Sequence, residues 1–223
     1  MSALSVVLPA GETPVTIAWS VPPEPTSVVA LAHGAGAGMD HPFLVGFAEA
    51  LHAAGIASLR FNFPYVEAGR RMPGPAAHAT ATWAAVVAEI GRELPDVPAV
   101  AAGKSYGGRM AAMAASEGRI APSALVYLGY PLHPPGAPEK LRAAHLPDIA
   151  VPQLFVEGTK DPFIQPLPQF GEVVATCRDA DVLWIDGGGH SFEVAGAKRP
   201  AADVGAALAA PVATWLARRL PAG

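Results

Sequence analysis

The sequence predicts a single α/β domain with a mostly parallel sheet, helices on both faces of that sheet and an antiparallel hairpin at the N-terminus. Its length of 223 residues suits one large domain better than two. Its strand-like segments are continuous apolar runs, the pattern of parallel strands that are buried on both faces. These runs alternate with helix-like segments, which favours repeated β-α units. We therefore expect one domain over residues 1–223.

Six apolar runs bounded by glycine and proline are the predicted parallel strands. They are Val28–Ala32, Ala57–Phe61, Ala99–Ala102, Ala124–Leu128, Gln153–Val156 and Asp181–Ile185. The helices predicted between and after them are approximately Pro42–Ala54, Ala76–Glu93, Tyr106–Ser116, Pro168–Cys177 and Ala201–Leu220. The hairpin precedes all of these and is predicted from two strand-like segments around a run of turn-forming residues, Leu4–Leu8 and Val15–Trp19.

Residues 129–151 are the longest stretch without a helical or strand period. They begin with a run rich in proline and glycine, so we expect a loop with at most one short helix at 139–144. Such a segment cannot supply a lid of two or more helices. The domain is therefore predicted to lack a lid, and its site to be open.

Composition and charge exclude several classes of protein. Hydrophobic residues make up 51% of the chain and charged residues 15%, which excludes global disorder. There are 15 basic and 19 acidic residues and no long basic run, so a nucleic-acid partner is not expected. Cys177 is the only cysteine, which excludes an internal disulfide. With no charged leader and no apolar run near the roughly 18 residues that span a membrane, we expect a cytoplasmic protein without a membrane partner.

The sequence predicts neither a metal nor a cofactor. The seven histidines show no spacing typical of metal ligands. The Gly-Lys-Ser at 103–105 resembles the end of a phosphate loop, but position 98, where that loop needs glycine, is proline. The glycine-rich segment 34–38 lacks the third glycine of a dinucleotide fingerprint, because position 39 is methionine.

Chemically active residues follow three of the predicted parallel strands. Ser105 follows the third, Asp161 the fifth and His190 the sixth. The carboxyl ends of parallel strands meet at one edge of the sheet, so these side chains are expected to lie together. Ser105 also stands in a Gly-x-Ser-x-Gly pattern between a strand and a helix. This is the nucleophile-elbow motif, in which glycines allow the sharp turn that projects the hydroxyl.

These three residue types suit nucleophilic catalysis. A serine hydroxyl becomes a nucleophile when a neutral imidazole accepts its proton, and a carboxylate fixes the tautomer of that imidazole. Ser105, His190 and Asp161 fit these roles as nucleophile, base and acid. Each also has a structural interpretation: Ser105 as a helix N-cap, Asp161 as an Asx-turn residue before a proline, and His190 as a packed histidine. The order of the three residues in the chain favours catalysis.

The site also needs donors for an oxyanion and has a rival acid. The expected donors are the backbone N–H groups of Tyr106, directly after the nucleophile, and Ala35, in the loop after the first parallel strand. Gly36 is the less favoured donor in that loop.

Asp186, four residues before His190, is the alternative acid, although the acid usually comes from the preceding loop.

Further side chains are expected near the same edge of the sheet. His33 is a candidate for contact with the substrate, but the favoured role is to brace the oxyanion loop by hydrogen bonding. Lys104 and Arg109 flank the elbow, where they either favour an anionic substrate or are solvated surface residues. The candidate substrate-lining residues are His33, Gly36, Tyr65, Lys104, Tyr130 and Phe192, and the neighbouring loops add Phe43, Phe63, Arg70, Arg71 and His133.

Several motifs together resemble a known family. They are HGAGAGMDHPF at 33–43, LRFNFPY at 59–65, GKSYGGRM at 103–110, LGYPLHPPG at 128–136, and the GTKDPF and GGGHSF segments around the acid and base. With them the chain resembles the α/β-hydrolase superfamily, in its small lidless branch near dienelactone-hydrolase-like enzymes. More narrowly it is similar to bacterial relatives of testis-expressed protein 30 and of the third subunit of the non-specific-lethal complex. The resemblance implies the fold, the triad and the oxyanion loop. It does not imply the substrate, since dienelactone enzymes use cysteine where this chain has Ser105.

The combined prediction is a cofactor-independent serine hydrolase of the carboxylesterase type. It would cleave small ester, thioester or related acyl substrates with water, through an acyl-enzyme, and would prefer short acyl chains. The alternative is a non-catalytic or weakly catalytic binding or scaffold module that keeps the hydrolase fold. A serine peptidase would use the same triad, but the chain has no additional domain to hold a long peptide.

Overall fold

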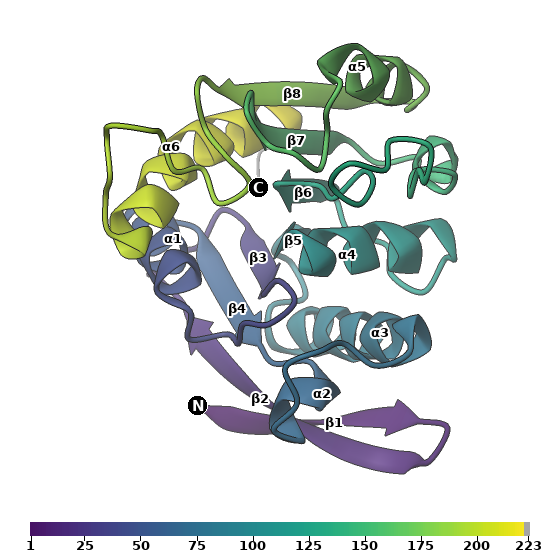
Figure 1. The fold of residues 1–223 in the computed structure, drawn as a ribbon. Coiled ribbons are helices and arrows are strands. Elements are labelled where there is room, and N and C mark those ends of the chain that lie inside the picture. The colour runs from purple at the N-terminus through teal and green to yellow at the C-terminus, as the bar shows by residue number, and fades with distance from the viewer. Residues whose placement is uncertain (221–223) are drawn as a thin grey trace.

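An eight-stranded sheet runs through the molecule in the order β1-β2-β4-β3-β5-β6-β7-β8 (Figure 1). Strand β2 pairs antiparallel with β1 and β4, and all other neighbours are parallel. The computed structural model describes residues 1–220, so the last three positions of the predicted domain 1–223 lie outside the described residues. The predicted single α/β domain with an N-terminal antiparallel hairpin is confirmed.

The strands lie close to their predicted positions. Their bounds are β1 Ser2–Leu8, β2 Gly11–Ser20, β3 Val28–Ala32, β4 Ala57–Phe61, β5 Ala99–Lys104, β6 Ala124–Leu128, β7 Gln153–Gly158 and β8 Ala180–Ile185. The helices are α1 Pro42–Ala53, α2 Pro64–Glu67, α3 Ala76–Glu93, α4 Tyr106–Ser116, α5 Leu167–Ala175 and α6 Ala201–Arg219, with a 3-10 turn at Leu146–Asp148.

The parallel strands are apolar on both faces because each face is covered by helices. In β3, Val28, Ala30 and Ala32 pack into the core shared with helices α3 and α4. The alternate residues Val29 and Leu31 pack into the core shared with α1 and α6. Figure 1 shows α1 and α6 together on one side of the sheet and α3 and α4 on the other. The predicted two-sided burial therefore holds for the central strands.

Three local predictions were wrong or incomplete. No helix forms at 139–144, and the backbone N–H of Arg142, which a helix would pair four residues back, donates to the Leu132 carbonyl instead (2.7 Å). The only helical turn of this loop comes later, at Leu146–Asp148. The short helix α2 was not predicted. Strand β8 is half-exposed rather than buried, because it is an edge strand and its Trp184 is 42% exposed.

No α-helix forms in residues 129–151, so no helical lid covers the carboxyl ends of the strands. This agrees with the predicted lidless domain. Within residues 1–220, none of the helices has both the length and the apolar character needed to cross a bilayer.

Candidate active site

Ser105 occupies the turn that joins strand β5 to helix α4. Its φ of 49° lies in the left-handed region, which is rare for a residue with a side chain. This conformation is the one that a nucleophile elbow imposes. In the described structure the Ser105 side chain makes no capping hydrogen bond to the helix, so the N-cap interpretation does not apply. Its hydroxyl is left for another partner.

Two glycines make this turn sterically allowed. A Cβ atom added at Gly103 would lie 2.3 Å from the Gly108 nitrogen, and one added at Gly107 would lie 2.6 Å from the His33 carbonyl oxygen. Neither distance is tolerated by real side chains, so the turn requires glycine at both positions. The two outer positions of the Gly-x-Ser-x-Gly pattern are therefore explained by close backbone packing.

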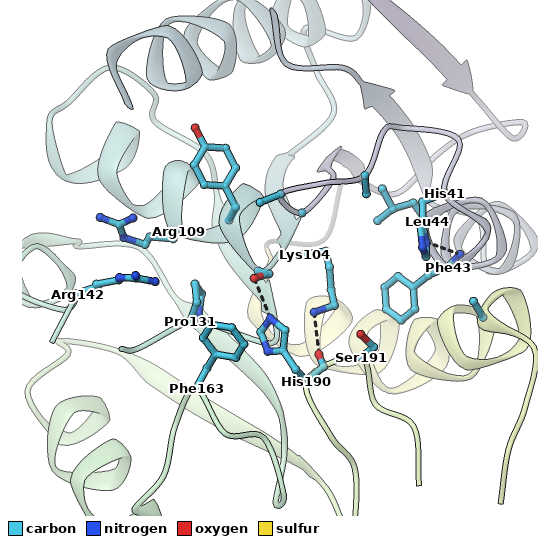
Figure 2. A pocket seen from close by; sticks show the side chains of 16 residues that line it. His41, Phe43, Leu44, Lys104, Arg109, Pro131, Arg142, Phe163, His190 and Ser191 are labelled. Atoms are coloured by element: carbon cyan, nitrogen blue, oxygen red, sulfur yellow. Dashed lines mark hydrogen bonds between the residues drawn. The ribbon is translucent and has the colours of Figure 1, made fainter. Parts of the chain in front are cut away.

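A continuous chain of hydrogen bonds joins Ser105, His190 and Asp161. The His190 Nε2 lies 2.8 Å from the Ser105 Oγ, a contact drawn as a dashed line in Figure 2. The His190 Nδ1 lies 2.6 Å from the Asp161 Oδ2. The other oxygen of Asp161 accepts a hydrogen bond from the Phe163 N–H (2.8 Å), so Asp161 is an Asx-turn residue and a partner of His190 at once. The structure thus brings the three predicted residues together.

The imidazole of His190 is electrostatically suited to accept a proton. Burial lowers its pKa below the ordinary value of 6.5, and the positive charge of Lys104 acts in the same direction against the raising effect of Asp161. His190 is therefore neutral at pH 7, with Nδ1–H donating to Asp161 and Nε2 free to accept from Ser105. The Phe163 ring packs against the imidazole, tilted by 32° with centroids 4.1 Å apart.

The rival acid is placed elsewhere. Asp186 is exposed, and its Oδ1 accepts a hydrogen bond from the Thr159 hydroxyl (3.3 Å). Asp161 is fully buried and holds the imidazole instead. The geometry therefore favours Asp161 over Asp186 as the partner of His190.

The predicted oxyanion donors, Tyr106 and Ala35, both line the cavity beside Ser105. The Tyr106 N–H is the first amide of helix α4, so it has no acceptor within the helix and lies at the positive end of the helix dipole. The Ala35 N–H has no protein acceptor among residues 1–220. Gly36, the less favoured donor, does not line the cavity in this structure.

His33 fixes the loop that carries Ala35. It is fully buried, with Nδ1 donating to the Gly34 carbonyl (2.8 Å) and Nε2 accepting from the Phe63 N–H (3.1 Å). Burial lowers its pKa to about 4, so it is neutral and can play both roles. His33 thus ties the loop after β3 to the loop after β4 and does not line the cavity.

A cavity of about 410 Å³ opens at the carboxyl ends of the central strands. Ser105 and His190 lie in its wall, with Phe43, Leu44 and Phe163 supplying apolar surface (Figure 2). Within the described residues, no group of three or more His, Cys, Asp or Glu side chains is arranged to hold a metal ion.

Most of the aromatic residues predicted to line the cavity pack into the core instead. Tyr130 is fully buried and its hydroxyl donates to the Arg142 carbonyl (2.7 Å). Tyr65 is buried with its hydroxyl directed at the Gly34 carbonyl (3.4 Å). Phe192 is buried and stacks on Phe43, with centroids 5.8 Å apart. The prediction that these three residues line the cavity was wrong, because their rings point into the hydrophobic core.

The neighbouring loops also contribute less than expected. Phe63 and His133 are fully buried, and Arg70 and Arg71 are exposed outside the cavity. The His133 ring is held by a hydrogen bond from its Nδ1 to the carbonyl of the next residue, Pro134 (2.8 Å). Of the residues that the neighbouring loops were predicted to add, Phe43 lines the cavity.

Lys104 lines the cavity, but its amine already has partners. The Nζ donates to the His190 carbonyl (2.7 Å) and lies 5.5 Å from the centre of the Phe192 ring. Burial lowers its pKa to about 8, against the attraction of Asp161, Glu157 and Glu193. Lys104 therefore ties the serine turn to the histidine turn.

Sequence reasoning missed three residues around the site. Phe163 follows the acid by two positions, and its role could have been found from the Asx turn. Glu157 is fully buried under the site, where its Oε1 accepts from the Tyr130 N–H (2.6 Å) and burial raises its pKa well above the ordinary value. Arg142 reaches the cavity from the irregular segment 129–151, for which the sequence gives no signal.

Comparison with known proteins identifies the family. A family model described as "Alpha/beta hydrolase domain" matches residues 25–214. The chain belongs to the α/β-hydrolase family. A search of the curated proteins finds no match. The narrower resemblance to relatives of testis-expressed protein 30 stays a prediction.

Solved structures similar to this α/β hydrolase cover nearly its whole length. A dienelactone hydrolase from Anabaena variabilis ATCC 29413 has a TM-score of 0.75 and 22% identity, covering 99% of this chain and 98% of its own. An α/β serine hydrolase without lid from Xanthomonas campestris has a TM-score of 0.70 and 22% identity, with 100% and 96% covered. The esterase domain of a Rhodothermus marinus protein has a TM-score of 0.68 and 15% identity, with 97% and 98% covered. At these identities the likeness is one of fold.

Proposed function

We propose that this α/β hydrolase is a serine hydrolase of the carboxylesterase type, acting on small ester, thioester or related acyl substrates. The observation that carries the proposal is the hydrogen-bond chain from the Ser105 Oγ through a neutral His190 to the buried Asp161. This chain opens on a cavity of about 410 Å³. Similar folds named as a dienelactone hydrolase, a serine hydrolase without lid and an esterase domain support the proposal.

Acylation would proceed in one addition and one elimination. The Ser105 Oγ attacks the carbonyl carbon of the substrate while its proton moves to the His190 Nε2, and Asp161 stabilises the imidazolium. The N–H groups of Ala35 and Tyr106 would bind the oxyanion of the tetrahedral intermediate. The intermediate collapses, the bond to the leaving alcohol or thiol breaks, and that group takes the proton from the imidazolium.

Deacylation would use the same groups with water as the nucleophile. Water attacks the acyl-enzyme carbonyl and gives a proton to the His190 Nε2. The bond between the acyl carbon and the Ser105 Oγ then breaks, and Ser105 recovers its proton from the imidazolium. The carboxylic acid leaves and the enzyme returns to its starting state.

The cavity favours small substrates. A volume of about 410 Å³ lies in the lower part of the range of roughly 300–1,000 Å³ for small-molecule sites. No helical lid covers it, so no lid movement can produce a rate increase at a lipid surface. We therefore expect acyl chains of roughly two to six carbons to be preferred.

The test is a series of p-nitrophenyl esters from acetate to palmitate, with wild type and Ser105→Ala. We expect the highest rate on short chains, no surge at the micellar threshold, and a loss of roughly 10³-fold or more in kcat for Ser105→Ala. Ser116→Ala is the control, because Ser116 only donates to a helix carbonyl at the far end of α4. More than a tenth of wild-type activity in Ser105→Ala would refute the nucleophile, and a maximum at twelve carbons or more would refute the substrate size.

A further inference from the structure

Two arginines lie at one end of the cavity. Arg109 is on helix α4, one turn after the nucleophile, and its backbone N–H donates to the Ser105 carbonyl (3.1 Å). Arg142 comes from the loop 129–151, and both side chains line the cavity. Figure 2 shows them on the same side of the site, beyond Pro131, at the opposite end from Phe43. The pair therefore flanks the space next to Ser105.

Neither guanidinium has a protein partner in the described part of the chain. Within residues 1–220, no carboxylate forms an ion pair with Arg109 or Arg142, and neither side chain donates a hydrogen bond. The Nε of Arg109 is buried without an acceptor. A buried donor without a protein acceptor is destabilising, so this N–H is available to a bound ligand, ion or water.

The charged side chains that line the cavity near this pair are cationic. Among residues 1–220, no Asp or Glu lines the cavity, while Lys104 adds a third cationic group whose amine is already engaged. Burial, and next the positive charge of Arg109, lower the pKa of Arg142. Burial and Arg109 also lower the pKa of the nearby His145 to about 4, against the opposing effect of Glu117 and Asp148, so that it stays neutral. A cavity lined by charges of one sign attracts ligands of the opposite sign.

We infer that Arg109 and Arg142 form a binding site for a free carboxylate of the substrate, so that this hydrolase prefers acyl esters carrying a negative charge. The planar guanidinium group matches a carboxylate through two parallel hydrogen bonds, which neither a lysine nor a water molecule reproduces. Because Arg109 is only one helical turn from Ser105, the carboxylate would lie a few carbon atoms from the scissile carbonyl. Half-esters of short dicarboxylic acids have this form. The inference rests on the proposed hydrolase function.

The kinetic test compares two substrates that differ only in charge at the end of a six-carbon acyl chain, mono-p-nitrophenyl adipate and p-nitrophenyl hexanoate. The measured quantity is the ratio of their kcat/KM values in wild type, Arg109→Met and Arg142→Met. We expect each substitution to lower this ratio about tenfold or more, because a hydrogen bond between charged groups is lost. Arg70→Met is the control, since Arg70 is exposed outside the cavity and should leave the ratio unchanged.

A second pair of substrates carries the carboxylate on the leaving group instead of the acyl chain. It compares 4-carboxyphenyl butyrate with phenyl butyrate. A preference for the anionic member of either pair that depends on both arginines supports the inference. A ratio that stays within about twofold of wild type in either arginine variant, for both pairs, overturns it, because an unpaired surface charge has an effect of that size. Far-ultraviolet circular dichroism and thermal melting show whether each variant is folded.

A binding measurement separates this inference from the proposed function. Calorimetry measures the binding of monomethyl adipate to Ser105→Ala, which needs no turnover, and to the same variant carrying Arg142→Met. Binding that weakens about tenfold or more on loss of Arg142 supports the carboxylate site even if no ester is hydrolysed. Ester hydrolysis that requires Ser105 but ignores substrate charge, together with unchanged binding, overturns the inference and leaves the proposed function standing.

Discussion

We call the triad with its partners the paired end of the site and the arginine pair the unpaired end, and the two hold their polar side chains in opposite ways. At one end, both oxygens of Asp161 and both ring nitrogens of His190 have protein partners. At the other end, Arg109 and Arg142 have no carboxylate or hydrogen-bond partner within residues 1–220. Groups that must move a proton benefit from being fixed before the substrate arrives. Groups that recognise a substrate must keep their hydrogen-bonding capacity free. The difference assigns chemistry to the first end and recognition to the second.

The two ends also differ in how they are built. The paired end comes from short turns directly after β5, β7 and β8, where hydrogen bonds to strands and neighbouring turns leave little freedom. Lys104 adds a further link, from the serine turn to the His190 carbonyl. The unpaired end takes Arg142 from the longest irregular segment, 129–151, and Arg109 from the second turn of a helix.

The largest effect should come from breaking the pairing of the acid. Asp161→Asn puts an amide beside the His190 Nδ1 and favours the wrong tautomer, so we expect kcat/KM to fall about a thousandfold or more. Asp186→Asn is the matched control, and because Asp186 is exposed it should stay within about twofold of wild type. Ester hydrolysis by the two variants, measured side by side, checks this, and the reverse order would show that the acid is misassigned.

A smaller effect should follow from cutting the link between the two turns. Lys104→Met removes the hydrogen bond to the His190 carbonyl, and we expect kcat to fall about tenfold as the histidine turn loosens. Lys160→Met removes the same charge from an exposed side chain that does not line the cavity. If both lysine variants retain wild-type kcat on a short ester, Lys104 does not position the histidine.

The smallest effect is a shift of the pH profile. Burial lowers the pKa of His190, and only the neutral imidazole accepts a proton, so kcat/KM should rise with pH through a midpoint below 6.5. The charge of Lys104 also disfavours the imidazolium, so Lys104→Met should move that midpoint to higher pH. A rate profile from pH 4 to 9 measures both, and a wild-type midpoint above 6.5 would contradict the electrostatics of the paired end.

Most of the sheet could be predicted from the sequence because its central strands are buried on both faces. Val28–Ala32 and Ala124–Leu128 are continuous apolar runs, and their bounds match the structure. The single-turn helix Pro64–Glu67 is too short to show a period, and it was missed. The short helix allowed for at 139–144 does not form, and the backbone N–H of Arg142 pairs with the Leu132 carbonyl within an irregular loop.

The site was predictable only where topology decides it. Ser105, Asp161 and His190 meet because the parallel strands before them end at one edge of the sheet, and that rule can be applied to a sequence. The Tyr130 ring packs against Phe155 and the Phe192 ring against Phe43, contacts between distant parts of the chain, so the sequence wrongly predicted that both rings line the cavity. Arg142 was missed for the same reason, because only the path of its loop brings it beside Arg109.

Labelling with a fluorophosphonate probe tests the central claim, that the paired end activates Ser105, most directly. In an activated site the Ser105 Oγ attacks phosphorus, a P–O bond forms, fluoride leaves and the proton passes to His190. Intact-mass and peptide mass spectrometry should show one adduct, on Ser105, in folded wild type and none in Ser105→Ala. A folded wild-type protein that stays unlabelled, or an adduct on another residue, would contradict the account.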